Sequence, residues 1–408
     1  MQEKISEFLQ ARIDAGDFPS AVYLVAEKGE VVFHDALGYA VVEPERIEAR
    51  LDTIYDLASL TKPLVTGLLL ARKIESGAAE LDDYVRHHLG ELARKTFSIR
   101  DLVAHKSGLP AWIPFYLFAP GFLRERARKR SLPFSDRKLN DFVLAKIATC
   151  EESREQAVVY SDLSFILVGF LTERLFGKAI YDAYATEIIN RLGLVRTFFG
   201  NLETFRREIA ASENGNEYEK QTCTEKGFLQ NYHPAAEAAP LLNKDGSLNT
   251  EIRIPQSALR NHLIWGEVHD GNAFFMGGVA GHAGLFSTAE EVFKIAQQFL
   301  PNYTTLLMPE TCDLFRTNFT KGMNEDRSFA FQLASTEGST AGTKISPESF
   351  GHNGFTGTSL WIDPVKERVF ILLTNRTHNH SLPFVNINSV RRQFHDLSVG
   401  LLEEKFSN

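Results

Sequence analysis

The sequence Ala58-Ser59-Leu60-Thr61-Lys62-Pro63 lies between a short apolar run of strand type, 53–57, and a longer apolar run, 64–74. The longer run repeats its apolar residues every three or four positions and is closely followed by a glycine, a pattern that predicts a helix. Ser59 is expected at the first turn of this helix, with Lys62 one turn further along the same face. Pro63 fits there because the first amides of a helix have no internal partner.

Ser59 and Lys62 form a pair that can support nucleophilic chemistry. A serine hydroxyl is a weak nucleophile until a base removes its proton. Burial and the positive end of a helix lower the pKa of an amine, so Lys62 is predicted to be a neutral proton acceptor. The alternative is a serine that caps the helix beside a solvated lysine. The same spacing recurs at Ser135-Asp136-Arg137-Lys138, where the charged interior predicts only a capped helix start.

The composition predicts a globular protein with one large core or two closely joined cores. The chain has 408 residues, of which 44% are hydrophobic and 24% are charged. The net charge of −8 offers no basic surface for nucleic acid or for an anionic membrane, so neither is an expected partner. The one locally basic run, Arg124–Arg130, is interpreted as a solvated helix face.

Cysteine usage and the first residues predict a cytoplasmic location. Cys150, Cys223 and Cys312 are odd in number and far apart, which fits a reducing compartment and argues against a disulfide framework or a zinc site. Residues 4–14 have the pattern of an amphipathic helix, and the sequence contains neither a signal-peptide core nor an apolar span of membrane length. No cofactor is expected.

Strand patterns occur at both ends of the chain, and helix patterns occupy the middle. A hairpin is predicted around Glu27-Lys28-Gly29, and the later expected elements are strands at 349–352, 356–362 and 369–374 and a final helix at 384–403. This order predicts an α/β fold of the α+β type, in which one antiparallel sheet is assembled from both chain ends and is flanked by helices. The predicted domains are a sheet domain, 1–58 and 335–408, and a helical domain, 59–334.

The helical domain contains three stretches of unusual composition. Residues 111–157 are rich in aromatic, proline and arginine residues, which suggests an inserted cap of helices, and residues 200–270 are polar and weakly periodic, which suggests long loops. Gly277–Gly284 is dense in glycine, but it lacks the Gly-Lys-Ser/Thr ending of a phosphate-binding loop. It is interpreted as a place of tight backbone packing. The functional cleft is expected between the sheet and the insertion.

Three short motifs follow one another along the chain: Ser59-Leu60-Thr61-Lys62, Tyr160-Ser161-Asp162 and His352-Asn353-Gly354. In this order they resemble the signature boxes of the serine β-lactamase-related hydrolases, a group of class C β-lactamases, penicillin-binding DD-peptidases and family VIII-type esterases. The strings 102–110 and 278–288 also resemble stretches of that family, and the resemblance spans residues 5 to 400 or so. It implies a β-lactamase/transpeptidase-like fold.

The resemblance also implies a role for each box. Ser59 would attack a carbonyl carbon to form an acyl-enzyme, with Lys62 as its proton acceptor or as the group that sets its pKa. Tyr160 would carry the proton to the leaving group, once the Lys62 ammonium has lowered its pKa. Whether Lys62 or Tyr160 is the general base stays open. The backbone amides of Ser59 and Phe355 would form the oxyanion hole.

The third box would bind substrate along its strand. His352, Asn353 and Gly354 are the expected binding residues, and Gly354 is explained because a side chain there would block the substrate. His-x-Gly also occurs at 269–271 and 282–284, but only the 352 copy opens a predicted strand. Asp162, in the second box, is expected either to contact the substrate or to cap the following helix.

Two positions depart from the family pattern. Asp162 stands where many members have asparagine, so an amide donor is lost. His352 replaces the lysine of typical β-lactamases, and a mostly neutral histidine holds a substrate carboxylate less firmly. Both differences weaken the prediction of antibiotic hydrolysis and leave esterase, peptidase and amidase activity open.

The predicted function is a serine hydrolase that acts through an acyl-enzyme on ester or amide bonds of small substrates. An amidase or peptidase acting on D-amino-acid or muropeptide fragments is the alternative, and a catalytically silent binding protein is another. A metal hydrolase using His378 and His380 lacks the His-Glu-x-x-His pattern. Aromatic residues in the cap fit an acyl pocket or an ordinary core equally well: Trp112, Phe115, Tyr116, Phe118 and Phe122.

Overall fold

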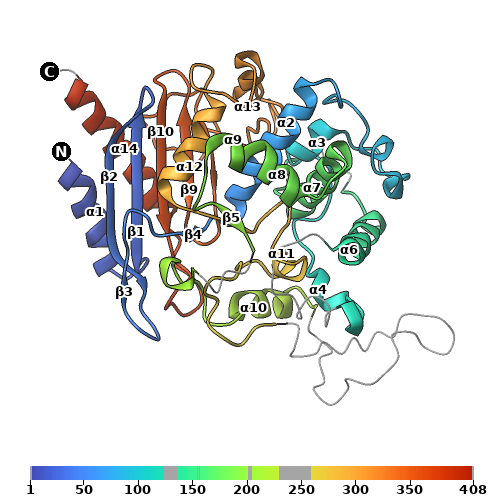
Figure 1. Cartoon of the computed structure of the whole chain (residues 1–408), viewed down its shortest axis with the longest axis horizontal. Coiled ribbons are helices and arrows are strands. Elements are labelled where there is room, and N and C mark those ends of the chain that lie inside the picture. The colour runs from blue at the N-terminus through green and yellow to red at the C-terminus, as the bar shows by residue number, and fades with distance from the viewer. Residues whose placement is uncertain are drawn as a thin grey trace.

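The computed structural model describes residues 2–123, 136–153, 155, 157–200, 205–228 and 259–406. Its main sheet is built from strands near both chain ends: β1 (Ser20–Glu27), β2 (Glu30–Val41), β3 (Ile47–Glu48), β7 (Gln332–Leu333), β8 (Phe350–Asn353), β9 (Ser359–Asp363) and β10 (Arg368–Thr374). The strand order is β3-β2-β1-β10-β9-β8-β7, and every neighbouring pair is antiparallel (Figure 1). The predicted fold class is confirmed.

Strand β1 joins the two ends of the chain at the centre of the sheet. It pairs with β2 on one side and with β10 on the other, in a register that runs from Ala21 opposite Thr374 to Glu27 opposite Arg368. Its alternate side chains point to opposite faces of the sheet, as strand geometry requires. Val22 and Leu24 enter the larger core, whereas Tyr23 and Val25 enter a smaller one.

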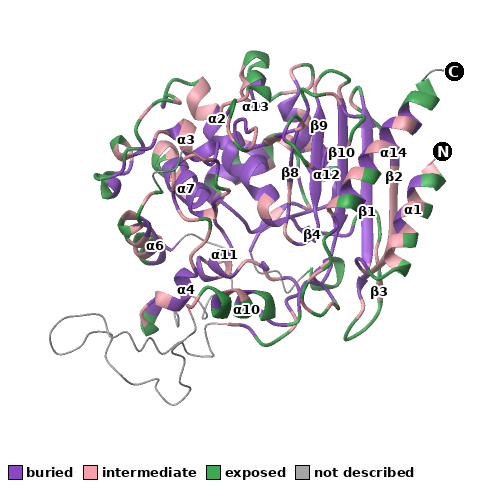
Figure 2. Ribbon diagram, turned by 180° about the vertical axis from the view of Figure 1, so that it is seen from behind, coloured by how far each residue is buried: buried purple, intermediate pink, exposed green. Residues whose placement is uncertain are grey.

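Helices cover both faces of this sheet. On the outer face α1 (Gln2–Asp14) and α14 (Asn388–Phe406) lie side by side, and Phe394 of α14 packs edge-on against Tyr23 at 5.9 Å (Figures 1 and 2). The other face is covered by α12 (Ala289–Ala296), beyond which lies the helical part of the molecule.

The helical part is built around α2 (Leu68–Glu75) and α7 (Asp162–Phe176). A small sheet in the order β4-β6-β5 links it to the main body, with β4 (Tyr55–Asp56), β5 (Phe198–Phe199) and β6 (Leu285–Ser287). The remaining helices of the described ranges are α3 (Ile99–Val103), α4 (Phe115–Phe118), α6 (Arg137–Thr149), α8 (Ile180–Tyr184), α9 (Asn190–Leu192), α10 (Glu217–Glu225), α11 (Gly271–Phe275) and α13 (Asp313–Arg316).

Several predicted elements differ in detail. Helix α10 lies in the stretch where only loops were expected, and residues 356–358 form part of a turn before β9. A helix does start near Lys138, where Asp136 caps α6, while Ser135 and the basic run Arg124–Arg130 lie outside the described residues. The segment after Ser59 is helical but begins with a π-helical stretch, Lys62–Gly67, before α2.

The glycine-dense loop packs as tightly as predicted. A Cβ atom on Gly281 would lie 2.2 Å from the carbonyl oxygen of Phe165 and 2.8 Å from the Cα atom of Gly169, both on α7. A Cβ on Gly278 would lie 2.7 Å from the Cα atom of Gly200. Neither position has room for a Cβ atom, so glycine is required at 281 by packing against α7 and at 278 by packing against Gly200.

Two features are absent from the described residues. None of the described helices has both the length and the apolar composition needed to cross a bilayer. In the same ranges, no group of three or more His, Cys, Asp or Glu side chains is arranged to hold a metal ion. The two ring nitrogens of His378 contact the backbone, with Nδ1 2.9 Å from the Ser212 carbonyl oxygen and Nε2 2.9 Å from the Val42 amide.

Candidate active site

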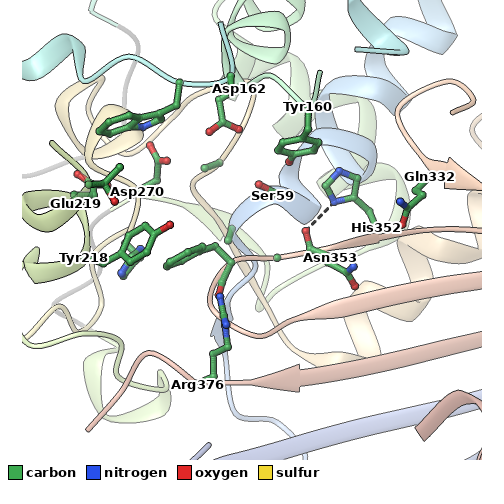
Figure 3. Close-up of a pocket in the computed structure, with 18 of the residues that line it drawn as sticks. Ser59, Tyr160, Asp162, Tyr218, Glu219, Asp270, Gln332, His352, Asn353 and Arg376 are labelled. Atoms are coloured by element: carbon green, nitrogen blue, oxygen red, sulfur yellow. Dashed lines mark hydrogen bonds between the residues drawn. The ribbon is translucent and has the colours of Figure 1, made fainter. Parts of the chain in front are cut away.

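A cavity of about 530 Å³ lies where the end of β8 meets the helical part of the molecule (Figure 3). The sequence-predicted residues that line it are Ser59, Tyr160, Asp162, His352, Asn353, Gly354 and Phe355. Lys62 is fully buried directly behind Ser59. The three boxes, far apart in the sequence, therefore converge on one site.

A constrained turn carries Ser59. The preceding residue, Ala58, has a φ of 47°, in the left-handed region that residues with a Cβ rarely adopt. Asp56 holds this turn, because its carboxylate accepts hydrogen bonds from the amides of Ala58 (2.8 Å) and His269 (2.7 Å). Thr61 adds a hydrogen bond from its hydroxyl to the Ala58 carbonyl at 2.7 Å. These bonds fix the backbone that positions Ser59 before the π-helical segment.

Lys62 is a buried ammonium with three partners. Its Nζ atom lies 2.8 Å from Ser59 Oγ, 2.7 Å from Asp162 Oδ1 and 3.1 Å from the carbonyl oxygen of His282. Burial lowers the pKa of Lys62, but the charge of Asp162 and the contact with Tyr160 outweigh it, so that the pKa is raised. The predictions of a neutral amine and of a solvated lysine are therefore both wrong for the unliganded protein.

Tyr160 lies beside this pair with its phenol protonated. The Nζ atom of Lys62 is 5.0 Å from the centroid of the Tyr160 ring, close enough for its charge to act on the phenol. Burial raises the pKa of Tyr160, and the opposing effect of Lys62 does not cancel it. The prediction that Lys62 lowers this pKa overall is wrong, so the resting phenol can donate a proton but not accept one.

His105 supports Tyr160 from the other side. The two ring centroids are 4.5 Å apart, and the Nδ1 atom of His105 accepts a hydrogen bond from the Ser161 amide at 3.0 Å. Burial holds the pKa of His105 well below its ordinary value, so the imidazole is neutral. Sequence reasoning gave His105 no role, although it lies in the family-like string 102–110.

Asp162 is the first residue of α7 and does not cap it. Ser161 is the cap, since its hydroxyl accepts a hydrogen bond from the Ser164 amide at 3.3 Å. The capping alternative for Asp162 is therefore wrong. Its carboxylate instead forms the ion pair with Lys62, and its side chain keeps 19% of its surface exposed to the cavity side.

His352 is neutral and presents an acceptor. Its Nδ1 atom lies 2.9 Å from the Asn353 carbonyl oxygen, which cannot donate, so Nδ1 carries the ring proton (Figure 3). The Nε2 atom is buried and has no hydrogen-bond partner among the described residues. Burial and the charge of Lys62 hold the pKa of His352 well below its ordinary value. A neutral His352 with an unprotonated Nε2 atom cannot hold a substrate carboxylate.

The segment after His352 includes Asn353, Gly354 and Phe355, and the backbone amide of Phe355 is the predicted oxyanion donor. The side-chain amide of Asn353 is bonded to the Thr340 hydroxyl, at 2.9 Å. A Cβ on Gly354 would lie 2.0 Å from Thr358 Oγ1 and 2.6 Å from the Leu57 carbonyl oxygen, so close packing against the Ser59 segment is enough to require glycine there. No described group accepts a hydrogen bond from the Phe355 amide.

Charged residues that sequence reasoning missed also line the cavity. Arg327, Arg376 and Arg391 contribute positive charge, and Glu219 and Asp270 lie on the wall opposite His352 (Figure 3). Burial and the charge of Asp270 raise the pKa of Glu219, which accepts hydrogen bonds from the Tyr116 hydroxyl (2.6 Å) and the Gly271 amide (2.7 Å). These residues had no sequence signal except that Asp270 lies in one of the extra His-x-Gly copies.

Comparison with known proteins relates the whole chain to one family. Residues 5–391 match the family described as Beta-lactamase. A protein of Escherichia coli (strain K12), named provisionally as a D-alanyl-D-alanine carboxypeptidase, is 29% identical over 92% of this chain and 82% of its own length.

Solved structures share the fold. EstCE1, a hydrolase with promiscuous acyltransferase activity, has a TM-score of 0.67 at 20% identity, with 98% of each chain covered. A class C beta lactamase from Rhodobacter sphaeroides has a TM-score of 0.62 at 15% identity, covering 97% of this chain and 99% of the other.

Proposed function

This chain belongs to the beta-lactamase family of serine hydrolases, and we propose that it cleaves ester or amide bonds of small substrates through an acyl-enzyme on Ser59. The observation that carries the proposal is the chain of contacts Asp162–Lys62–Ser59, with distances of 2.7 and 2.8 Å, at the wall of the cavity. A base held in such a series of contacts can remove the proton of the serine hydroxyl, which is otherwise a weak nucleophile.

The proposed proton path starts from the charge state of the resting site. As Lys62 passes a proton to Asp162, its amine accepts the proton of Ser59, and Ser59 Oγ bonds to the substrate's carbonyl carbon. The amides of Ser59 and Phe355 then hold the negatively charged oxygen; in comparable sites one such donor contributes about 3–4 kcal/mol. The Tyr160 phenol donates its proton to the leaving group, which departs as the carbonyl re-forms.

Within this chemistry we infer a peptide substrate with a carboxylate beyond the scissile bond, as in a D-alanyl-D-alanine peptide. Because His352 is neutral, that carboxylate would depend on the cavity's arginines for its counter-charge. Arg327 lies beside Tyr160, with its guanidinium carbon 5.4 Å from the centroid of the tyrosine ring. The name of the Escherichia coli relative supports the same substrate class.

A neutral ester is the second candidate substrate. Its support is the aromatic wall of the cavity, where Trp112, Tyr218 and Phe355 offer apolar surface to an acyl group. An esterase would not need the arginines for binding, so the two candidates differ in their dependence on a substrate carboxylate.

The test is covalent labelling together with a substrate panel. A fluorophosphonate probe should label the wild-type protein at Ser59, as mapped by peptide mass spectrometry, and Ser59→Ala should lose both label and turnover. Ser135→Ala, the serine of the duplicated spacing, should retain full activity. A label found on any other residue would overturn the proposal. Comparing D-alanyl-D-alanine peptides, p-nitrophenyl esters and nitrocefin by kcat/KM then decides the substrate class.

A further inference from the structure

Arg391 is a buried cation that has no acidic partner among the described residues. It lies in the first turn of α14, is 5% exposed, and borders the cavity. Within the described ranges no ion pair joins it to a carboxylate, and burial together with the charge of Arg376 lowers its pKa to about 9. Burying a guanidinium group away from water costs free energy unless hydrogen bonds compensate for the lost hydration.

Those hydrogen bonds go to the turn that carries Phe355. The Nη2 atom of Arg391 donates to the carbonyl oxygens of Gly354 at 3.0 Å and Thr358 at 2.9 Å, while Nη1 donates to Asn388 Oδ1 at 3.0 Å. The Gly354 carbonyl and the Phe355 N–H belong to one peptide group. Arg391 therefore holds the oxygen end of the same peptide whose nitrogen end is the predicted oxyanion donor.

The neighbouring peptide is held in a similar way. Arg376 donates from Nε to the Phe355 carbonyl oxygen at 2.8 Å, and its guanidinium carbon lies 5.0 Å from the centroid of the Phe355 ring. Two guanidinium groups thus hold successive carbonyl groups of one turn. The Phe355 amide between them has no described acceptor, so it is free to donate to a ligand.

We propose that Arg391 is a positioning residue for the oxyanion hole, which both orients and polarises the Gly354–Phe355 peptide. A charge-assisted hydrogen bond to a carbonyl oxygen draws electrons toward that oxygen and makes the N–H of the same peptide a stronger donor. The effect is greatest when the oxyanion forms, so it stabilises the transition state more than the bound substrate. This inference rests on the proposed acyl-enzyme function and assigns a residue that acts through the backbone.

The competing explanation is that Arg391 binds a substrate carboxylate directly. Its Nε atom has no partner among the described residues, and a carboxylate in the cavity could approach it. The two roles affect different kinetic constants. Direct binding changes KM for carboxylate-bearing substrates alone, whereas polarisation changes kcat for every substrate.

The kinetic test uses p-nitrophenyl acetate, whose leaving group has no carboxylate. Arg391→Met should lower kcat about 10- to 100-fold with little change in KM, a part of the loss expected for removing a whole oxyanion donor. Arg391→Lys should lose less, because an ammonium keeps the charge but not the planar fork. Added methylguanidinium should restore part of the activity of Arg391→Ala. The matched control is Arg392→Met, the next residue of α14, which donates to the Gly338 carbonyl outside the cavity.

A spectroscopic test does not depend on activity. Gly-Phe pairs occur only at 121–122, 169–170, 227–228 and 354–355, so a protein labelled with ¹³C at glycine carbonyls and ¹⁵N at phenylalanine gives few coupled signals. In Arg391→Met the 354–355 signal should shift, with its amide proton moving upfield as the peptide loses polarisation. The other three signals should stay in place, which also verifies that the variant is folded.

Three results would overturn the inference. The first is an unchanged kcat for p-nitrophenyl acetate with a raised KM for a carboxylate-bearing peptide. The second is a kcat loss in Arg391→Met with an unmoved 354–355 signal, and the third is an equal loss in Arg392→Met. Failure of the underlying hydrolase proposal is separate, because it would appear in the wild-type protein as turnover that survives Ser59→Ala.

Discussion

At the scale of single residues, the positive charge on Lys62 defines the protonation state of the resting site. Sequence spacing predicted that burial would neutralise the amine, because it took no account of the Asp162 carboxylate. The carboxylate lies 2.7 Å from Nζ and keeps the amine protonated. In the proposed mechanism the lysine acts as a base only while Asp162 takes up its proton, so substituting Asp162 would change the base as well as the cavity wall.

Asp162→Asn should move the acidic limb of the pH–rate profile to higher pH. In the wild-type protein the charged Lys62 can act as the base because Asp162 takes up its proton, whereas asparagine cannot, so only protein whose Lys62 is already neutral would be active. The measurement is kcat/KM against pH with a neutral ester. Asp141→Asn, an exposed carboxylate of α6, should leave the profile unchanged. An acidic limb that stays in place or moves to lower pH would contradict Asp162 as the proton acceptor of Lys62.

At the scale of elements, the site depends on how the loop at Gly277–Gly284 meets α7. Gly281 lies against Phe165 and Gly169, and the next residue supplies the carbonyl that binds Lys62 at 3.1 Å. The N-terminal turn of the same helix supplies Asp162. The spacing between loop and helix therefore controls two of the three contacts of Lys62.

Gly281→Ala should destabilise the protein by about 1–3 kcal/mol, because its Cβ would meet backbone atoms that cannot move away easily. We also expect kcat to fall about tenfold or more as the His282 carbonyl shifts. Denaturant unfolding and ester hydrolysis measure the two effects. Gly90→Ala, where a Cβ meets nothing within 4 Å, is the matched control and should change stability by less than about 0.5 kcal/mol. Equal effects of both substitutions would refute the packing argument.

The elements that the sequence predicted are those whose signal is local. The strands at both ends, the helix after Ser59 and the three boxes all follow from patterns within a few residues. Helix α10 escaped detection because its residues are polar and its buried side chains, such as Glu219, are held by partners distant in sequence.

The missed site residues share this non-local origin. Arg391 resembles any arginine in an amphipathic helix until the fold brings α14 to the Gly354 turn. Likewise, the role of His105 becomes visible only when the fold places its ring against that of Tyr160. The charge states of Lys62 and Tyr160 were mispredicted because the Asp162 carboxylate of another segment keeps Lys62 protonated and burial keeps the phenol of Tyr160 protonated.

At the scale of the whole molecule, buried and partly buried histidines link stability to pH. Burial lowers the pKa of six of them: the buried His105, His352, His378 and His395 and the partly buried His34 and His380. The unfolded chain binds protons at these positions more readily than the folded one. Their contribution to stability is therefore present above the ordinary histidine pKa and is lost as the pH falls below it.

His395 allows this link to be measured away from the cavity. Its pKa is lowered from 6.5 to about 4, and its Nδ1 atom lies 2.7 Å from the Thr340 carbonyl oxygen. Between pH 7.5 and pH 5 this one residue should remove on the order of 2 kcal/mol of unfolding free energy. His395→Gln, which cannot titrate, should show a drop smaller by that amount in urea unfolding at the two pH values. Exposed His87→Gln should behave as the wild type, and an identical drop in His395→Gln would rule the assignment out.

The pairing of β1 with β10 has a consequence for the newly made chain. During translation β1 leaves the ribosome early, with apolar side chains on both faces and only β2 beside it. Its other edge stays open until β10 has been synthesised, so the nascent protein should need a chaperone over that interval. Ser59 is likewise made long before the turn that carries Phe355, the second donor of the proposed oxyanion hole. We therefore expect a ribosome-bound fragment that stops short of β8 to hydrolyse no substrate.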